Sequence, residues 1–282
     1  MPLKLLRLLW ILRSRLATDT LTARICVNFN NKDGNDALVG TALKESGLDR
    51  SSLYLASKLG NIFYRPEHLM KAVEKTLNDL QVGYLDLLML HWPFAHLNDG
   101  KGHLVFDSNK VPAIDNDVTV HDAWRAIESL VDQGIVRDIG VSNFAIRHLE
   151  HLEQATTIKP AVNQVEMHPY LAQTDLLNYC KEKGIVITAY SPLGARPNAK
   201  SVLNDPVVDK VAVRNSKSKA QVLLSWANQR GTITIPKSAK PARIQENFGI
   251  FELSSEDMDD LNKLDKGLRY IDPSKAWNMS CF

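Results

Sequence analysis

The stretch Tyr84-Leu-Asp-Leu-Leu-Met-Leu-His-Trp-Pro93 decides the fold. Its residues 85–90 are apolar except for Asp86, and the apolar run stops at His91. A short apolar run of this kind is typical of a strand that is buried on both faces, as in a parallel sheet covered by helices. The carboxyl end of such a strand is where α/β barrels place catalytic groups. Taken alone, His91 fits a surface or capping histidine equally well.

Other predicted strands also end in residues with functional groups, and helical patterns separate most of them. Strand–helix alternation predicts right-handed parallel units. Six or seven such units in 282 residues predict one α/β domain that closes into a TIM-type barrel, with its active site at the strand ends. The expected strands are 53–58, 84–93, 135–143, 161–164, 184–191 and 232–238, with 24–29 as a further candidate, and the expected helices are 34–46, 65–80, 119–133, 145–155, 173–183 and 219–230.

Composition restricts the class of protein. The hydrophobic fraction of 44% supplies an ample core, and a net charge of +2 with both signs interspersed gives no sign of nucleic-acid binding. Three scattered cysteines favour a reducing compartment, so we expect a cytoplasmic protein. No apolar run approaches the roughly 18 residues that span a membrane. We expect no metal site, because His96 and His103 fall in an irregular stretch and are interpreted as solvated surface.

Two segments depart from the regular alternation. Residues 1–24 are basic and apolar with no acid before Asp19, so they form a segment apart from the barrel domain at 25–282. A mitochondrial presequence has this character, which would change the compartment, but we favour an ordinary helix or strand or a wrongly assigned start of the coding sequence. Residues 94–118 form the longest irregular stretch, and a loop of that length is usually functional, as a lid or a substrate wall.

Six sets of residues at the strand ends resemble the aldo-keto reductase family and follow its order from about Asp33 to the C-terminus. They are Ala56-Ser-Lys-Leu59, Tyr84-Leu-Asp-Leu87 with His91-Trp-Pro93, Gly140-Val-Ser-Asn-Phe144, Asn163-Gln-Val-Glu166, Ala189-Tyr-Ser-Pro-Leu-Gly194, and Ile235-Pro-Lys-Ser238 with Arg243-Ile-Gln-Glu-Asn247. The resemblance implies a (β/α)8 barrel that reduces aldehydes or ketones with NADPH, as a monomer or weak homodimer.

The resemblance also implies a cofactor site. Lys237 and Arg243 match the residues that grip the adenosine 2′-phosphate, and fixed cations suit a dianion, which favours NADP(H) over NAD. Solvated surface charge is the alternative for these two residues, and a core position is the alternative for Tyr190. The expected cofactor-binding residues are Ser142, Asn143 and Gln164 at the carboxamide, Tyr190 on the nicotinamide ring, Ser191 and Leu193 at the pyrophosphate, Lys237, Ser238 and Arg243 at the 2′-phosphate end, and Glu246 and Asn247 near the adenine.

The catalytic residues match the family only in part. Lys58 and His91 match its lysine and histidine, whereas Asp33 occupies the position of its proton-donating tyrosine and Asn28 that of its aspartate. Hydride delivery creates an alkoxide that needs a proton, and an aspartate ionised beside Lys58 cannot donate one. His91 is then the best remaining acid, and we expect reduction to be weaker by about 10²-fold or more.

The remaining expectations concern the substrate and the start of the barrel. Trp92, Phe94 and Trp277 are expected to form an apolar wall that receives the carbonyl compound. The family's opening hairpin and first strand are missing or replaced, at best by residues 5–12. Two alternatives stay open: a catalytically inactive NADPH-binding or interaction protein on the same barrel and, from barrel architecture alone, a phosphate-sugar isomerase or aldolase that needs no nicotinamide.

Overall fold

The computed structural model describes residues 10–12, 24–30, 36–194 and 201–282. The chain divides into two compact units. The first contains the residues up to Asn163 together with Pro273–Phe282, and the second contains Gln164–Asp272. Strands and helices alternate in both units, as the sequence predicts.

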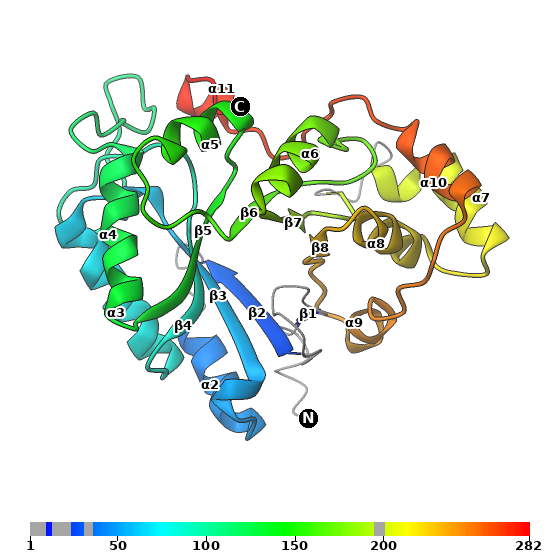
Figure 1. Cartoon of the computed structure of the whole chain (residues 1–282), viewed down its shortest axis with the longest axis horizontal. Coiled ribbons are helices and arrows are strands. Elements are labelled where there is room, and N and C mark those ends of the chain that lie inside the picture. The colour runs from blue at the N-terminus through cyan, green and yellow to red at the C-terminus, as the bar shows by residue number, and fades with distance from the viewer. Residues whose placement is uncertain (1–9, 13–23, 31–35, 195–200) are drawn as a thin grey trace. The chain divides into compact units, whose positions relative to one another are not determined.

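Parallel strands form the centre of the first unit (Figure 1). β2 is parallel to β3, β3 to β4 and β4 to β5, whereas β1 is antiparallel to β2. The strands predicted around 24–29, 53–58, 84–93 and 135–143 are therefore confirmed, and Trp10–Leu12 is the described part of the predicted replacement strand at 5–12. The strands are β1 Trp10–Leu12, β2 Arg24–Asn30, β3 Leu53–Leu59, β4 Leu85–Leu90 and β5 Val136–Ser142.

The helices of the first unit begin and end at the signals that the sequence carries. In α3, Pro66 occupies the first turn, where its missing N–H costs nothing, and Leu69 and Val73 are buried. In α4, the side chains of Thr119 and Asp122 form a reciprocal capping box. The helices are α2 Asp36–Ser46, α3 Pro66–Leu80, α4 Val120–Asp132, α5 Ile146–Glu153 and α11 Ser274–Trp277, with short 3-10 helices η2 Arg50–Ser52 and η3 Asn61–Phe63.

Every residue of β4 is buried, including the charged Asp86. Its carboxylate lies 2.8 Å from the guanidinium of Arg50 and 3.0 Å from that of Arg137. It also accepts a hydrogen bond of 2.9 Å from the backbone N–H of Leu55. Both guanidinium groups stack over the ring of Tyr84. Because Asp86 lies near the amino end of its strand, away from the usual side of barrel chemistry, this cluster stabilises the sheet.

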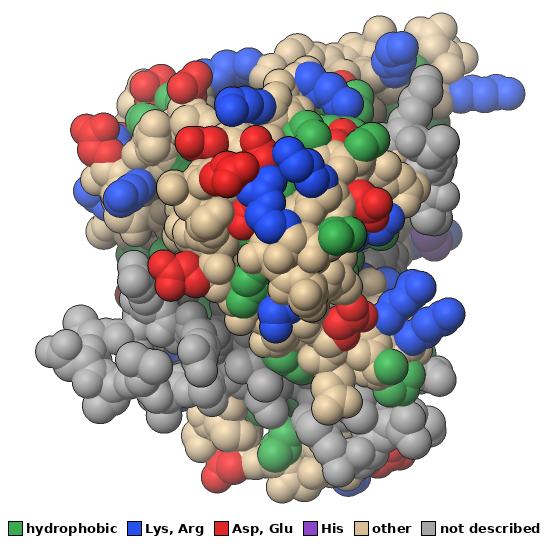
Figure 2. All heavy atoms as spheres, turned by 90° about the vertical axis from the view of Figure 1, so that its right-hand side faces the viewer, with side chains coloured by type: hydrophobic (Ala, Val, Ile, Leu, Met, Phe, Trp, Pro, Cys, Tyr) green, Lys and Arg blue, Asp and Glu red, His purple; other side chains and the backbone are tan. Residues whose placement is uncertain are grey.

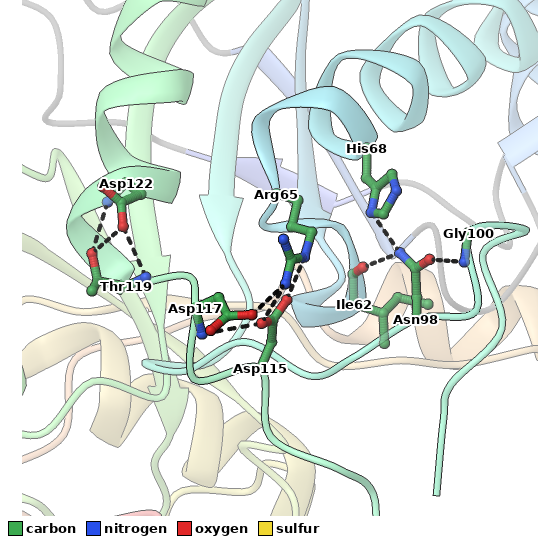
Figure 3. A network of polar contacts seen from close by, with 9 residues as sticks. All are labelled: Ile62, Arg65, His68, Asn98, Gly100, Asp115, Asp117, Thr119 and Asp122. Atoms are coloured by element: carbon green, nitrogen blue, oxygen red, sulfur yellow. Dashed lines mark hydrogen bonds and ion pairs between the residues drawn. The ribbon is translucent and has the colours of Figure 1, made fainter.

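Residues 94–118 contain no helix or strand, as predicted, but long-range contacts fasten them to the first unit. The guanidinium of Arg65 donates two hydrogen bonds to Asp115, of 2.7 and 2.8 Å (Figure 3). His96 is only 3% exposed, its Nδ1 lies 2.9 Å from the amide nitrogen of Asn61, and its ring packs against Trp277. The expectation that His96 is solvated is therefore wrong, whereas the side chain of His103 is 76% exposed.

The second unit contains β7 and β8, which pair in parallel. The strand expected at 232–238 is described only as Ile233–Thr234, and Pro236 has no N–H with which to extend a ladder. α7 and α10 were not predicted, although the Asp205 side chain caps α7 at the N–H of Val207. The elements are β6 Val162–Glu166, which begins in the first unit, α6 Thr174–Lys183, β7 Val186–Tyr190, η4 Val202–Asn204, α7 Pro206–Arg214, α8 Lys219–Gln229, β8 Ile233–Thr234, α9 Pro241–Glu246 and α10 Ser255–Asn262.

One face of the molecule shows how the charged side chains are distributed. Figure 2 shows Lys and Arg side chains among Asp and Glu side chains on the face that it presents, in keeping with the net charge of +2. On this face neither sign of charge dominates. Among the helices of the described residues, none has the length and apolarity to cross a membrane.

His148 caps the start of α5, and its titration makes the stability of the protein depend on pH. The neutral ring of His148 accepts a 3.1 Å hydrogen bond at Nδ1 from the N–H of Ala145. Burial, with the positive charges of Arg147 and His151, lowers the pKa of His148 to about 4. Between roughly pH 6.5 and 4 the unfolded chain therefore binds more protons than the folded one, and stability falls as the pH decreases.

We expect wild-type protein to lose about 1 kcal/mol more than His148→Gln between pH 7 and pH 5, an estimate reduced for the exposed part of the ring. Glutamine keeps an acceptor at the cap but does not titrate. Urea unfolding at both pH values measures the difference. Equal losses in the two proteins would show that His148 does not titrate on unfolding.

Candidate active site

His91 follows β4 at the carboxyl edge of the parallel strands of the first unit. The backbone N–H of His91 donates a 3.2 Å hydrogen bond to the backbone carbonyl of Leu59. Leu59 directly follows Lys58 at the end of β3. The side-chain amide of Asn143 donates a 3.0 Å hydrogen bond to the His91 carbonyl and a 3.3 Å bond to the hydroxyl of Ser142. The structure thus brings four of the predicted site residues to neighbouring strand ends: Lys58, His91, Ser142 and Asn143.

Tyr64 fixes the backbone beside His91, although no pattern in the sequence indicated this role. Its side chain is fully buried. The hydroxyl donates a 2.6 Å hydrogen bond to the carbonyl of Trp92 and accepts a 3.1 Å bond from the N–H of the same residue. Burial raises the pKa of Tyr64 far above its usual value, so the phenol remains a neutral donor. It therefore holds the chain where β4 gives way to the irregular segment.

The three predicted wall residues lie together. The edge of the Trp277 ring meets Trp92 at a centroid distance of 4.9 Å and Phe94 at 5.4 Å. Phe282, which the sequence did not indicate, contacts Trp92 at 5.8 Å. Edge-to-face packing of this kind is favourable beyond the area that it buries. The last residues of the chain thus complete an aromatic cluster beside His91, whose ring centroid lies 6.1 Å from that of Trp92.

In the second unit, several predicted cofactor residues lie on β6 or at the end of β7. Gln164 is buried on β6, and Tyr190 is the last residue of β7. Burial, and next the negative charge of Glu166, raises the pKa of Tyr190 far above its usual value. Ser191 then takes the left-handed conformation (φ 48°), which turns the chain sharply toward Leu193. Tyr190, Ser191 and Leu193 therefore lie at or just beyond the carboxyl end of β7.

The remaining predicted cofactor residues lie at the end of β8 and on α9. The N–H of Ile235 donates to Ala189, so the segment that holds Lys237 and Ser238 leaves the sheet beside the end of β7. Lys237 and Arg243 are exposed, and within the described ranges no carboxylate lies at ion-pair distance from either. Glu246 is partly exposed, its carbonyl accepting from Gln221, whereas Asn247 is buried.

The two residues that depart from the family pattern are only partly described. Asn28 lies on β2 opposite Ala56 of β3, and Asp33 lies outside the described residues. Over the part of the chain that the structure covers, no group of three or more His, Cys, Asp or Glu side chains is arranged to hold a metal ion.

Comparison with known proteins identifies the family. The Aldo/keto reductase family model matches residues 28–266. The chain is 42% identical over 254 residues to aldo-keto reductase family 1 member A1 of Xenopus tropicalis, covering 85% of this chain and 77% of the relative. It is 42% identical over 258 residues to aldose reductase B of Dictyostelium discoideum, with 88% and 82% covered. The structure of aldose reductase from Giardia lamblia matches with a TM-score of 0.85 at 35% identity over 91% of this chain and 89% of that chain.

The chain belongs to the aldo-keto reductase family, a family of oxidoreductases. The predicted (β/α)8 barrel class is thereby confirmed. The individual roles of the site residues stay predictions.

Proposed function

We propose that this protein reduces aldehydes or ketones with NADPH, and that its proton delivery is weakened. The observation that supports the proposal most is the cluster at the strand ends of the first unit. His91 and Lys58 lie on neighbouring strands there, with Trp92, Phe94 and Trp277 gathered beside them. A polar donor at the edge of an apolar wall suits a carbonyl compound. The donor can protonate the carbonyl oxygen, and the rest of the molecule can pack against the apolar wall.

The residues present fit a phosphorylated nicotinamide cofactor. Lys237 and Arg243 are exposed cations without a carboxylate partner among the described residues, so both are available to a 2′-phosphate. In the first unit, Ser142 and Asn143 would bind the carboxamide. In the second unit, Tyr190 would stack on the nicotinamide ring. When bound, NADPH supplies the hydride.

The chain itself supplies positioning, exclusion of water and a proton. The aromatic wall keeps water from the reacting carbonyl, which strengthens the electrostatic interactions there. Asn143 and Tyr64 hold the backbone on either side of the His91–Trp92 bond. His91 donates the proton to the developing alkoxide, because Asp33 replaces the family's phenol. Catalysis by a less suitable acid is slower, by about 10²-fold or more.

A catalytically inactive NADPH-binding protein is the second candidate, and the replacements at Asn28 and Asp33 favour it. Titration of NADPH followed by fluorescence, beside an assay of aldehyde turnover, distinguishes the two. Binding with slow turnover supports the weakened reductase, whereas binding with no turnover supports the inactive protein. Properly folded protein without affinity for NADPH would contradict both.

The preference for NADPH is expected to depend on the two cations. We expect Lys237→Gln/Arg243→Gln to weaken NADPH binding by about 10²-fold, since each removes a charge-assisted contact, and to leave NADH binding nearly unchanged. Lys181→Gln/Lys210→Gln removes the same charge from α6 and α7 and serves as the control. Equal weakening of NADPH and NADH binding by the first pair would contradict a contact with the 2′-phosphate.

A further inference from the structure

A cavity of about 360 Å³ lies within the first unit, apart from the residues assigned to catalysis and cofactor binding. One face of α3 lines it, together with Asp36 at the start of α2, Phe63 of η3 and the loop from Asn98 to Gly102. Its volume is that of a site for a small molecule. The residues that α3 contributes are His68, Lys71, Ala72, Lys75, Thr76 and Asp79.

The spacing of these six residues places them on a single face of α3, because positions three and four apart are neighbours on a helix. Leu69, Val73 and Leu80 lie on the adjoining side of the helix and pack into the core. The cavity is therefore lined by a polar and basic face of α3, and the helix is anchored independently of it. Lys71 and Lys75 on this face are exposed, so their substitution should leave the apolar contacts of α3 intact.

Asn98 fastens the loop to the helix and makes this wall of the cavity rigid (Figure 3). Its amide group donates hydrogen bonds of 2.6 Å to the Ile62 carbonyl and 2.9 Å to Nδ1 of His68, and its oxygen accepts a 2.7 Å bond from the N–H of Gly100. The two backbone contacts fix the orientation of the amide, so Nδ1 of His68 must be the acceptor. The proton of the neutral ring is then on Nε2, which makes this ring nitrogen a donor.

The three lysines that line the cavity differ in whether a carboxylate of the described residues pairs with them. Lys75 forms an ion pair with Asp79 on the same helix. For Lys71 and Lys101, the described part of the chain places no carboxylate at ion-pair distance. Two such cations on different elements suit a phosphate group, whose charge they can share.

The remaining residues that line the cavity suit a ligand with several hydroxyl groups. The carboxylates of Asp36 and Asp79 and the hydroxyl of Thr76 can accept hydrogen bonds from hydroxyl groups. Phe63 offers an aromatic face for the C–H side of a sugar, and Gly102 lies against that ring, since a Cβ atom there would stand 3.5 Å from it. Gly102 also has a φ of +91°, a conformation in which side chains are strained.

We propose that this cavity is a binding site for a small sugar phosphate. Lys71 and Lys101 hold the phosphate, and the carboxylates of Asp36 and Asp79 receive the hydroxyl groups. The inference is independent of the proposed reductase function, because it uses none of the residues assigned to the substrate or the cofactor.

Isothermal titration calorimetry of the full chain with glucose 6-phosphate tests the proposal, with glucose and inorganic phosphate as comparison ligands. We expect glucose 6-phosphate to bind more tightly than either comparison ligand. Lys71→Gln/Lys101→Gln should weaken its binding by at least about tenfold, as expected for the loss of charge-assisted hydrogen bonds. Ala72→Phe, which fills the cavity and keeps every charge, should weaken it comparably. Thermal unfolding confirms that each variant is folded.

Two control variants make the result specific. Lys181→Gln/Lys210→Gln lowers the net charge equally and should bind glucose 6-phosphate like wild type. Lys237→Gln/Arg243→Gln removes the proposed 2′-phosphate contacts and should also bind it normally. The proposal is overturned by no binding up to about 10 mM ligand, by inorganic phosphate binding as tightly as the sugar phosphate, or by loss of binding in either control but not in Lys71→Gln/Lys101→Gln.

Discussion

Asp33→Tyr is expected to raise kcat/KM for aldehydes by about 10²-fold, the gain that a well-matched general acid contributes. The substitution puts a phenol where the family's proton donor stands. It also removes a carboxylate whose ionised form opposes the developing alkoxide. The rate of NADPH oxidation with a panel of aldehydes measures the effect. Because the cofactor residues are untouched, the affinity for NADPH should stay within about twofold.

Two further variants separate the phenol from the charge. Asp33→Phe supplies the ring without the hydroxyl, and Asp33→Asn removes only the charge. Both should gain far less than Asp33→Tyr. Robust turnover by the wild-type protein, or a gain in Asp33→Phe equal to that in Asp33→Tyr, would contradict the proposal that proton delivery limits the rate of carbonyl reduction.

Asp86→Ala is expected to lower the free energy of unfolding by about 3–5 kcal/mol, the range for breaking a buried ion pair from one side. The carboxylate is fully buried and serves two guanidinium groups and the N–H of Leu55. Its removal leaves Arg50 and Arg137 close together over Tyr84 without the carboxylate that pairs with both. Urea unfolding monitored by circular dichroism gives the difference.

Asp117→Asn is the matched control, because this carboxylate also pairs with an arginine, Arg65, at 3.3 Å but is 83% exposed. Exposed ion pairs contribute little, so its loss should cost no more than about 1 kcal/mol. A similar cost for the two variants would show that burial does not set the strength of the Asp86 cluster.

Local signals in the sequence predicted the main elements. The apolar run at 85–90 identified β4, because few other structures bury every residue of a six-residue segment. Pro66 and the apolar face of α3, and the apolar residues Trp124, Ile127 and Leu130 of α4, predicted those helices with bounds close to the observed ones. In each case the signal lies within the element that it specifies.

The features that the sequence missed depend on contacts between distant residues. Tyr64 has no distinguishing neighbours, and only the fold brings its hydroxyl to the backbone of Trp92. His96 was expected in solvent because its segment is polar, but the tail residue Trp277 covers it. α7 carries a start signal in Asp205 and Pro206, but no helix was predicted there.

The first unit is not continuous in sequence, because Pro273–Phe282 belong to it although Gln164–Asp272 do not. During synthesis on the ribosome, its strands emerge long before the tail that carries Trp277. Domains synthesised from the N-terminus can fold as they emerge, but this unit obtains its full aromatic wall only when Pro273–Phe282 have been made. A truncation that removes Pro273–Phe282 would therefore keep the strands and take Trp277 from the surface proposed to receive the carbonyl compound.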